Sequence, residues 1–266
     1  MTTDKASNSG DLKTEVNRIE DMINSPSMRD LRSRTRESIG YVRPKNASTM
    51  ILLGGPKDDP VVLMGKRNQN LKFMPGALVF PGGSVDKHDG SIPAASELSS
   101  KTEERLIASM RGRPTRRGAR ALALAAVREV AEESGLLVGK AGTLETNHPD
   151  WDMFAKRNIV PSLDGLRLFS RAVTPPGMSR RFDTWFFISH ASHIGFTPKG
   201  GFEPSGELEG LQWIRPEDAI SENTREITRV MLVELIRRLR QDPDLVDNYP
   251  APYYHTIRSR FHKTII

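Results

Sequence analysis

Short apolar runs separated by turn-forming residues predict several strands in the first third of the chain. Met50–Leu53 and Val61–Met64 are apolar, and the residues between them, 54–60, include two glycines and two prolines. This arrangement predicts a β-hairpin with a long turn. A third apolar run, Ala77–Phe80, predicts another strand and is followed by Pro81-Gly82-Gly83.

Helical patterns appear further along the chain. The alanine-rich segment Ala119–Leu136 favours a helix, and Gly135 is well placed to end it. Ile227–Leu239 carries apolar residues at helical spacing and predicts an amphipathic helix. Further strands are expected at Leu166–Ala172, Thr184–Ile188 and Leu211–Ile214. Strands and helices in this order predict an α/β fold with a mixed β-sheet between helices.

Three segments show little of this patterning. Residues 1–44 form a polar N-terminal extension, expected to be partly helical or disordered, with Leu12, Val16, Ile19 and Ile23 at helical spacing. Residues 87–118 are rich in Ser, Arg and Gly and predict a surface insertion with one helical turn around Leu106–Met110. Residues 242–266 contain three prolines and are expected to be an irregular tail. Residues 45–241 therefore form the expected functional domain.

Composition and charge exclude several classes of protein. The 266 residues contain no cysteine, which excludes disulfides, zinc–thiolate sites and a thiol nucleophile. No apolar run approaches the roughly 18 residues of a membrane helix, and the N-terminus lacks the apolar region of a signal peptide. We therefore expect a cytoplasmic protein without a membrane partner. The net charge of +6 is mild for this length and does not favour nucleic acid as a partner.

Much of the positive charge lies in residues 101–120, where seven basic residues accompany two acidic ones. One interpretation is attraction of a phosphate-rich ligand, and the other is a solvated basic loop.

The segment Arg128–Leu136 carries the strongest chemical signal. Glu129, Glu132 and Glu133 stand at positions i, i+3 and i+4, so their carboxylates share one helix face. Like charges at this spacing repel one another, and the face therefore attracts cations. One interpretation is a solvated acidic face with salt bridges inside the helix. The other is a site for Mg²⁺, which prefers carboxylate and carbonyl oxygens and often acts beside substrate phosphates.

Together with Pro81-Gly82-Gly83, this segment resembles the Nudix hydrolase family, whose signature reads G-x5-E-x7-R-E-U-x-E-E-x-G-U, where U is a bulky apolar residue. Arg128 to Leu136 match every specified position of its second half. The resemblance implies an α/β/α sandwich and a diphosphatase that uses Mg²⁺ or Mn²⁺. It implies that Glu129, Glu132 and Glu133 hold the metal with the carbonyl of Gly83, and that Arg128 orients the carboxylates.

The first half of the signature departs from the family pattern. Gly83 and Arg128 are 45 positions apart instead of fourteen, so the signature contains an insertion of 31 residues. Its first glutamate would fall at Arg120 and is missing or displaced. Glu97, Glu103 and Glu104 are open as spatial replacements.

The block Leu63–Gly83 is similar to one found in Nudix proteins that cleave coenzyme A and acyl-CoA. Arg67, Leu71, Gly76 and Phe80 agree in register, although Met74 replaces a histidine of that block. Asp86 and Asp89 complete a D-x-x-D pattern that follows it, and turn formation is the alternative reading of both. The long insertion also resembles one branch of these enzymes.

This second resemblance implies a substrate site. Arg67, Gly82 and Arg181 are candidates for substrate contact, although Arg67 could instead brace the Gly-Gly loop. Glu207 is a candidate for the additional acid that Nudix enzymes often recruit from outside the signature, with a solvated loop acid as the alternative. His88, His190 and His193 do not form a convincing metal set in the sequence.

The expected partner is a small nucleotide. CoA or acyl-CoA would be hydrolysed to 3′,5′-ADP and (acyl-)phosphopantetheine. Two alternatives stay open: a Nudix hydrolase of ADP-ribose, NADH or a dinucleoside polyphosphate, and a nucleotide-sensing Nudix module without turnover. The sequence also leaves open whether the protein forms a homodimer.

Overall fold

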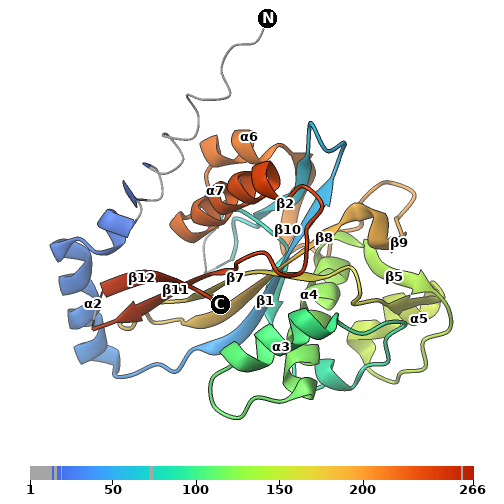
Figure 1. The fold of residues 1–266 in the computed structure, drawn as a ribbon, viewed down its shortest axis with the longest axis horizontal. Coiled ribbons are helices and arrows are strands. Elements are labelled where there is room, and N and C mark those ends of the chain that lie inside the picture. Colours follow the sequence, from blue (N-terminus) through green and yellow to red (C-terminus); the bar gives the residue numbers. More distant parts are fainter. Residues whose placement is uncertain (1–13, 15–16, 19, 72–74, 259) are drawn as a thin grey trace, which may run out of the picture.

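A mixed β-sheet lies at the centre of the computed structural model, which describes residues 14, 17–18, 20–71, 75–258 and 260–266 (Figure 1). Its strands run in the order β10 (Leu208–Ile214), β2 (Val61–Arg67), β1 (Lys45–Gly54), β8 (Phe182–His190), β7 (Arg167–Val173), β11 (Pro252–Ile257) and β12 (Arg260–Ile265). Two short strands, β3 (Leu78–Val79) and β4 (Gly82–Ser84), pair with β2 and β1. β1 is parallel to β8, and β7 is parallel to β11, whereas the other pairs are antiparallel. The predicted mixed sheet is therefore confirmed.

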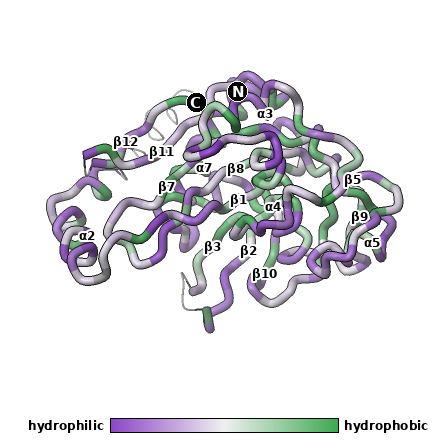
Figure 2. The backbone as a smooth tube through the Cα atoms, turned by 90° about the horizontal axis from the view of Figure 1, so that it is seen from below, coloured by the Kyte–Doolittle hydropathy of each residue, from purple (hydrophilic) through white to green (hydrophobic). Residues whose placement is uncertain are grey.

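Helices cover both faces of this sheet (Figure 1). One face packs against α3 (Ser100–Ser109) and α4 (Arg116–Ser134), and the other against α6 (Pro216–Ser221) and α7 (Glu226–Gln241). Side chains of a strand alternate between the two faces. Accordingly, Met50 and Leu52 of β1 belong to the core under α4, whereas Ile51 and Leu53 belong to the core under α7. Figure 2 shows the hydrophobic segments gathered in the interior, including α4 and β2.

A smaller unit packs beside α4. It contains the three strands β6 (Ile159–Pro161), β5 (Leu137–Ala141) and β9 (Ile194–Phe196), with helix α5 (Asp152–Lys156) and the 3₁₀ turns η2 (Pro149–Trp151) and η3 (Ala191–His193) in the connecting segments. The 3₁₀ turn η1 (Asp89–Ser91) lies between β4 and α3 and packs against α4. β5 begins shortly after α4 ends, because Gly135 adopts a left-handed conformation with φ of 77° and terminates the helix. Trp151 and Phe154 are buried in the core that α4 shares with this unit.

The C-terminal segment corrects one expectation. Residues 252–265 are a β-hairpin, not an irregular tail, and β11 extends the main sheet by pairing with β7. The Tyr254 hydroxyl donates to the Glu234 carboxylate of α7 at 2.8 Å, which ties the hairpin to the helical layer. The prolines suggested irregularity, but Pro252 is the first residue of its strand, a position that does not interrupt a sheet.

The insertion and the N-terminal segment also differ in detail from expectation. The insertion contains the ten-residue helix α3, capped by the Ser99 side chain, rather than one helical turn. Helix α2 (Pro26–Ile39), capped by Ser25, shows that part of the polar extension is helical. The predicted helical positions Leu12, Val16 and Ile19, and Met74 of the upstream block, lie outside the described residues. Among the described helices, none combines the length and the hydropathy needed to cross a bilayer.

Candidate active site

The site forms where β4 places its two glycines on the acidic face of α4. The backbone N–H of Gly82 donates to Glu133 Oε2 at 2.9 Å. Gly83 lies so close to Glu129 that a Cβ atom at position 83 would be 2.5 Å from both carboxylate oxygens. β4 is held in this place by antiparallel pairing with β1, in which Ser48 faces Gly83. Segments about fifty residues apart in sequence thus form one site, which an unrelated fold around the same helix would not produce.

Arg128 organises the carboxylates of this face. Its guanidinium donates to Glu129 Oε1 at 2.9 Å, to both oxygens of Glu132 at 3.2 Å and to the Ser84 carbonyl at 2.8 Å. The remaining donors bind Asp89 in a bidentate pair at 2.9 and 3.1 Å. Arg128 and Asp89 are buried, so this pair is shielded from water. One arginine therefore fixes two of the three signature glutamates to β4 and to the start of the insertion.

Burial raises the pKa values of the acids that face one another in this site. Burial raises the pKa of Glu129 to about 7, and the neighbouring charge of Glu132 adds to this effect, while Arg128 opposes it. Burial also raises the pKa of Glu133 to about 8, opposed by the Gly82 hydrogen bond and supported by the charges of Glu129 and Glu207. Burial likewise raises the pKa of Glu132. Without a metal, the site thus holds carboxyl groups whose ionised forms have too little positive charge nearby to stabilise them.

These shifts predict how metal-free stability depends on pH. In the unfolded chain Glu129 and Glu133 ionise near the ordinary pKa of 4.5, whereas in the folded chain they keep protons up to about 7 and about 8. The folded state binds more protons in this interval, so the two acids lower the free energy of unfolding as the pH rises from about 5 to about 8. Melting temperatures measured over this interval in EDTA should fall more steeply for the wild type than for Glu133→Gln. Equal slopes would contradict the prediction.

Gly83→Ala tests the close approach of β4 to α4. The added methyl group has no room beside the Glu129 carboxylate, so this side chain must move. Glu129 is a candidate site residue, and a misplacement of about 1 Å in an active site can cost roughly a hundredfold in activity, so we expect a loss of this size in kcat/KM. Gly200→Ala is the matched control, because a Cβ there meets no atom of the described part of the chain within 4 Å. Similar activities for the two variants would show that the contact is unimportant.

Other predicted site residues fall into two groups. Arg67 and Glu207 lie near enough to Glu133 for their charges to shift its pKa in opposite directions, and Glu207 is exposed just before β10. Arg181, by contrast, is buried and donates to the carbonyls of Val42 and Thr174, so its guanidinium braces the chain. The Gly82 N–H likewise donates to Glu133 and so helps to position this carboxylate.

At the displaced signature position, the structure distinguishes among the acids left open by the sequence. Arg120 Nε donates to both carboxylate oxygens of Glu97, at 3.0 and 2.8 Å. Glu103 instead pairs with Arg116. Glu97 is therefore the acid that lies against the position where the first signature glutamate would fall.

Asp89 is the main site residue that sequence reasoning underrated. The alternative reading of the D-x-x-D pattern was a turn, and Asp86 does form one, since its Oδ1 accepts from the backbone N–H of His88 at 2.8 Å. Asp89, however, is buried against Arg128. The upstream resemblance was a usable signal, but only the fold revealed that its partner is the signature arginine.

Comparison with known proteins agrees with this geometry, although no family model matches the chain. A putative Nudix hydrolase 7 from Caenorhabditis elegans is 28% identical over 202 residues, covering 69% of this chain and 56% of the relative. The acyl-coenzyme A diphosphatase NUDT19 of Xenopus laevis is 25% identical over 212 residues, covering 62% and 55%. The chain thus spans little more than half the length of these curated relatives.

A solved structure supports the same conclusion for the fold. The crystal structure of a Nudix hydrolase from Alicyclobacillus acidocaldarius covers 76% of this chain with 93% of its own, at a TM-score of 0.56 and 24% identity. The fold is the Nudix fold, and the curated relatives support the Nudix family for this chain, with a resemblance to its CoA branch. Their names support the expectation of a Nudix-type diphosphatase.

Proposed function

We propose that this chain is a metal-dependent Nudix diphosphatase that cleaves the diphosphate bond of a nucleoside diphosphate derivative, with CoA or acyl-CoA as the substrate. The observation that carries the proposal is the contact of Glu129 and Glu133 of α4 with the Gly82-Gly83 strand, with Glu132 held beside them by Arg128. Buried carboxylates with raised pKa values are a donor set that suits a hard divalent cation. Glu129, Glu132 and Glu133 would hold Mg²⁺ or Mn²⁺, together with the carbonyl of Gly83.

The residues of the chain would divide the chemical work. When bound, the metal supplies a water of lowered pKa and neutralises charge that develops on the phosphates. Arg128 keeps Glu129 and Glu132 in place through charge-assisted hydrogen bonds. A water oxygen forms a bond to one phosphorus as the bridging P–O bond breaks, and one of the acids at the site takes the proton of the water. Glu207, exposed beside Glu129 and Glu133, is a candidate for this acid.

Support for the CoA branch comes from one relative and from the upstream block. The Xenopus relative is named as an acyl-coenzyme A diphosphatase. Arg67, the arginine of the block, lies on β2 and lowers the pKa of Glu133 through its charge, which supports it as the candidate for contact with a substrate phosphate. Cleavage of CoA would give 3′,5′-ADP and phosphopantetheine, and acyl-CoA would give acyl-phosphopantetheine.

Product analysis by mass spectrometry tests this proposal. The purified chain is incubated with Mg²⁺ or Mn²⁺ and separately with CoA, acyl-CoAs, ADP-ribose, NADH and diadenosine tetraphosphate. We expect 3′,5′-ADP from the CoA compounds and no turnover by Glu133→Gln. Preference for another compound would overturn the assignment to CoA while keeping the diphosphatase. Absence of turnover with every compound and both metals would favour a nucleotide-sensing module.

A further inference from the structure

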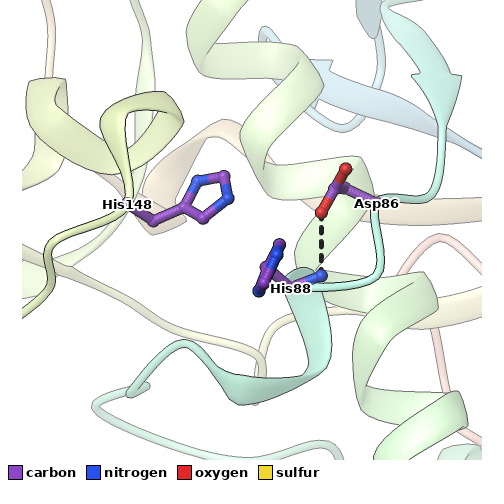
Figure 3. Close-up of side chains that lie close together, drawn as sticks. All are labelled: Asp86, His88 and His148. Atoms are coloured by element: carbon purple, nitrogen blue, oxygen red, sulfur yellow. Dashed lines mark hydrogen bonds between the residues drawn. The ribbon is translucent and has the colours of Figure 1, made fainter.

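A second group of ligand side chains lies beside the acidic face of α4. Asp86 and His88 follow β4, and His148 precedes η2, sixty residues further along the chain. The three side chains converge (Figure 3), and one potential ligand atom from each lies within 4.8 Å of the other two. The two imidazole rings have centroids 4.9 Å apart and an interplanar angle of 44°. Two imidazoles and a carboxylate in this proximity are a typical donor set for a divalent transition metal.

The backbone and neighbouring side chains hold this group in place. The Asp86 carboxylate accepts from the His88 backbone N–H, and the Asp86 N–H donates to Asp89 Oδ2, both at 2.8 Å. Behind His148, the carboxylate of Asp150 lies 3.5 Å from Nδ1, and this buried nitrogen has no hydrogen-bond partner among the residues that the structure describes. A carboxylate at the second nitrogen commonly orients a metal-binding histidine.

We propose that Asp86, His88 and His148 bind a divalent transition metal ion of the Zn²⁺ type at a site separate from the carboxylates of α4. His148 would bind through Nε2, with its Nδ1–H directed to Asp150. The two imidazoles give this site a different metal preference from the all-oxygen α4 site, because imidazole suits Zn²⁺ and similar ions whereas Mg²⁺ prefers oxygen ligands.

A chain of hydrogen bonds connects this site to the α4 carboxylates. Asp89 accepts from the Asp86 backbone and also binds Arg128, which in turn binds Glu129 and Glu132. A bound ion would join the start of the insertion to the segment before η2. It would thereby hold Asp89, the partner of Arg128, in place without itself lying in the substrate site.

Zn²⁺ binding by the full chain tests the proposal, measured by isothermal titration calorimetry in excess Mg²⁺ so that the α4 carboxylates are occupied. We expect one equivalent to bind and to raise the melting temperature. His88→Gln and His148→Gln should each weaken binding by at least about tenfold, and Asp150→Asn by about tenfold. His262→Gln, on the exposed edge strand β12, is the matched control and should bind like the wild type.

A further variant separates this proposal from the proposed function. Glu133→Gln should lose diphosphatase activity but keep Zn²⁺ binding. Circular dichroism of each variant confirms that loss of binding is not loss of fold. The proposal is overturned if the wild type binds no Zn²⁺ in excess Mg²⁺, if folded His88→Gln and His148→Gln variants bind like the wild type, or if Glu133→Gln abolishes Zn²⁺ binding. None of these results would bear on the cleavage of CoA in Mg²⁺.

Discussion

Glu133→Gln is expected to lower kcat/KM for the diphosphate substrate by at least about a hundredfold, the range that removal of an acid–base or metal-binding carboxylate typically produces. Glu133 is buried, and its Oε2 accepts the Gly82 N–H. The amide oxygen of glutamine can still accept this hydrogen bond, so the substitution removes the charge and leaves the packing. Steady-state kinetics with saturating Mg²⁺ measures the effect.

Stability provides the control for this variant. A buried carboxylate with a pKa near 8 opposes folding above its ordinary pKa, so the metal-free variant should melt at the same temperature as the wild type or higher at neutral pH. Glu217→Gln, at the exposed first turn of α6, should behave like the wild type in both assays. Near-normal activity of Glu133→Gln would remove Glu133 from the proposed site.

Arg128→Met is expected to destabilise the protein by about 3–5 kcal/mol at neutral pH, because it leaves buried acids without their cation. Asp89 loses both of its bonds to the guanidinium, and Glu129 loses its bond at 2.9 Å. Denaturant unfolding measures the free energy. The penalty should shrink as the pH falls, since the abandoned acids then become neutral.

A second buried arginine makes it possible to separate stability from activity. Arg171 forms a bidentate pair with Asp183 at 2.7 and 2.6 Å between β7 and β8, in a part of the sheet that holds none of the site residues. Arg171→Met should cost a similar free energy. Below the unfolding transition it should keep wild-type kcat, whereas Arg128→Met should not, because Glu129 and Glu132 are no longer held. Equal kcat values for the two variants would show that Arg128 stabilises the fold but does not position the catalytic carboxylates.

Local patterns predicted much of the fold because each acts within a few residues. Short apolar segments located β1, β2, β7, β8 and β10, and alanine content with a terminal glycine located α4. The C-terminal hairpin was missed because its prolines outweighed the β-branched and aromatic residues of Pro252–Ile257 and Arg260–Ile265. These residues become strands by adding to the edge of β7, and no local pattern identifies that edge.

The candidate site divides in a similar way. Glu129, Glu132, Glu133 and Arg128 were found from their helical spacing and the family resemblance, since one helix face is a local property. For Arg181 the structure shows hydrogen bonds to backbone carbonyls, which the sequence did not indicate because a substrate phosphate and a buried carbonyl both accept hydrogen bonds from an arginine side chain. Asp89 was underrated and His148 was not considered, because their partners lie 39 and 60 residues away in the sequence.

The sequence by itself determined the acidic helix, the glycine pair and several of the strands, because spacing and propensity act over a few residues. Only the tertiary structure decided what those elements meet. In the fold, Gly83 contacts Glu129 despite the 31-residue insertion between them, and Asp89 is buried against Arg128. The fold also brings His148 to Asp86 and His88. Contacts between segments that are distant in the sequence depend on the packing of the whole core. This packing positions the side chains of those segments closely enough to form hydrogen bonds.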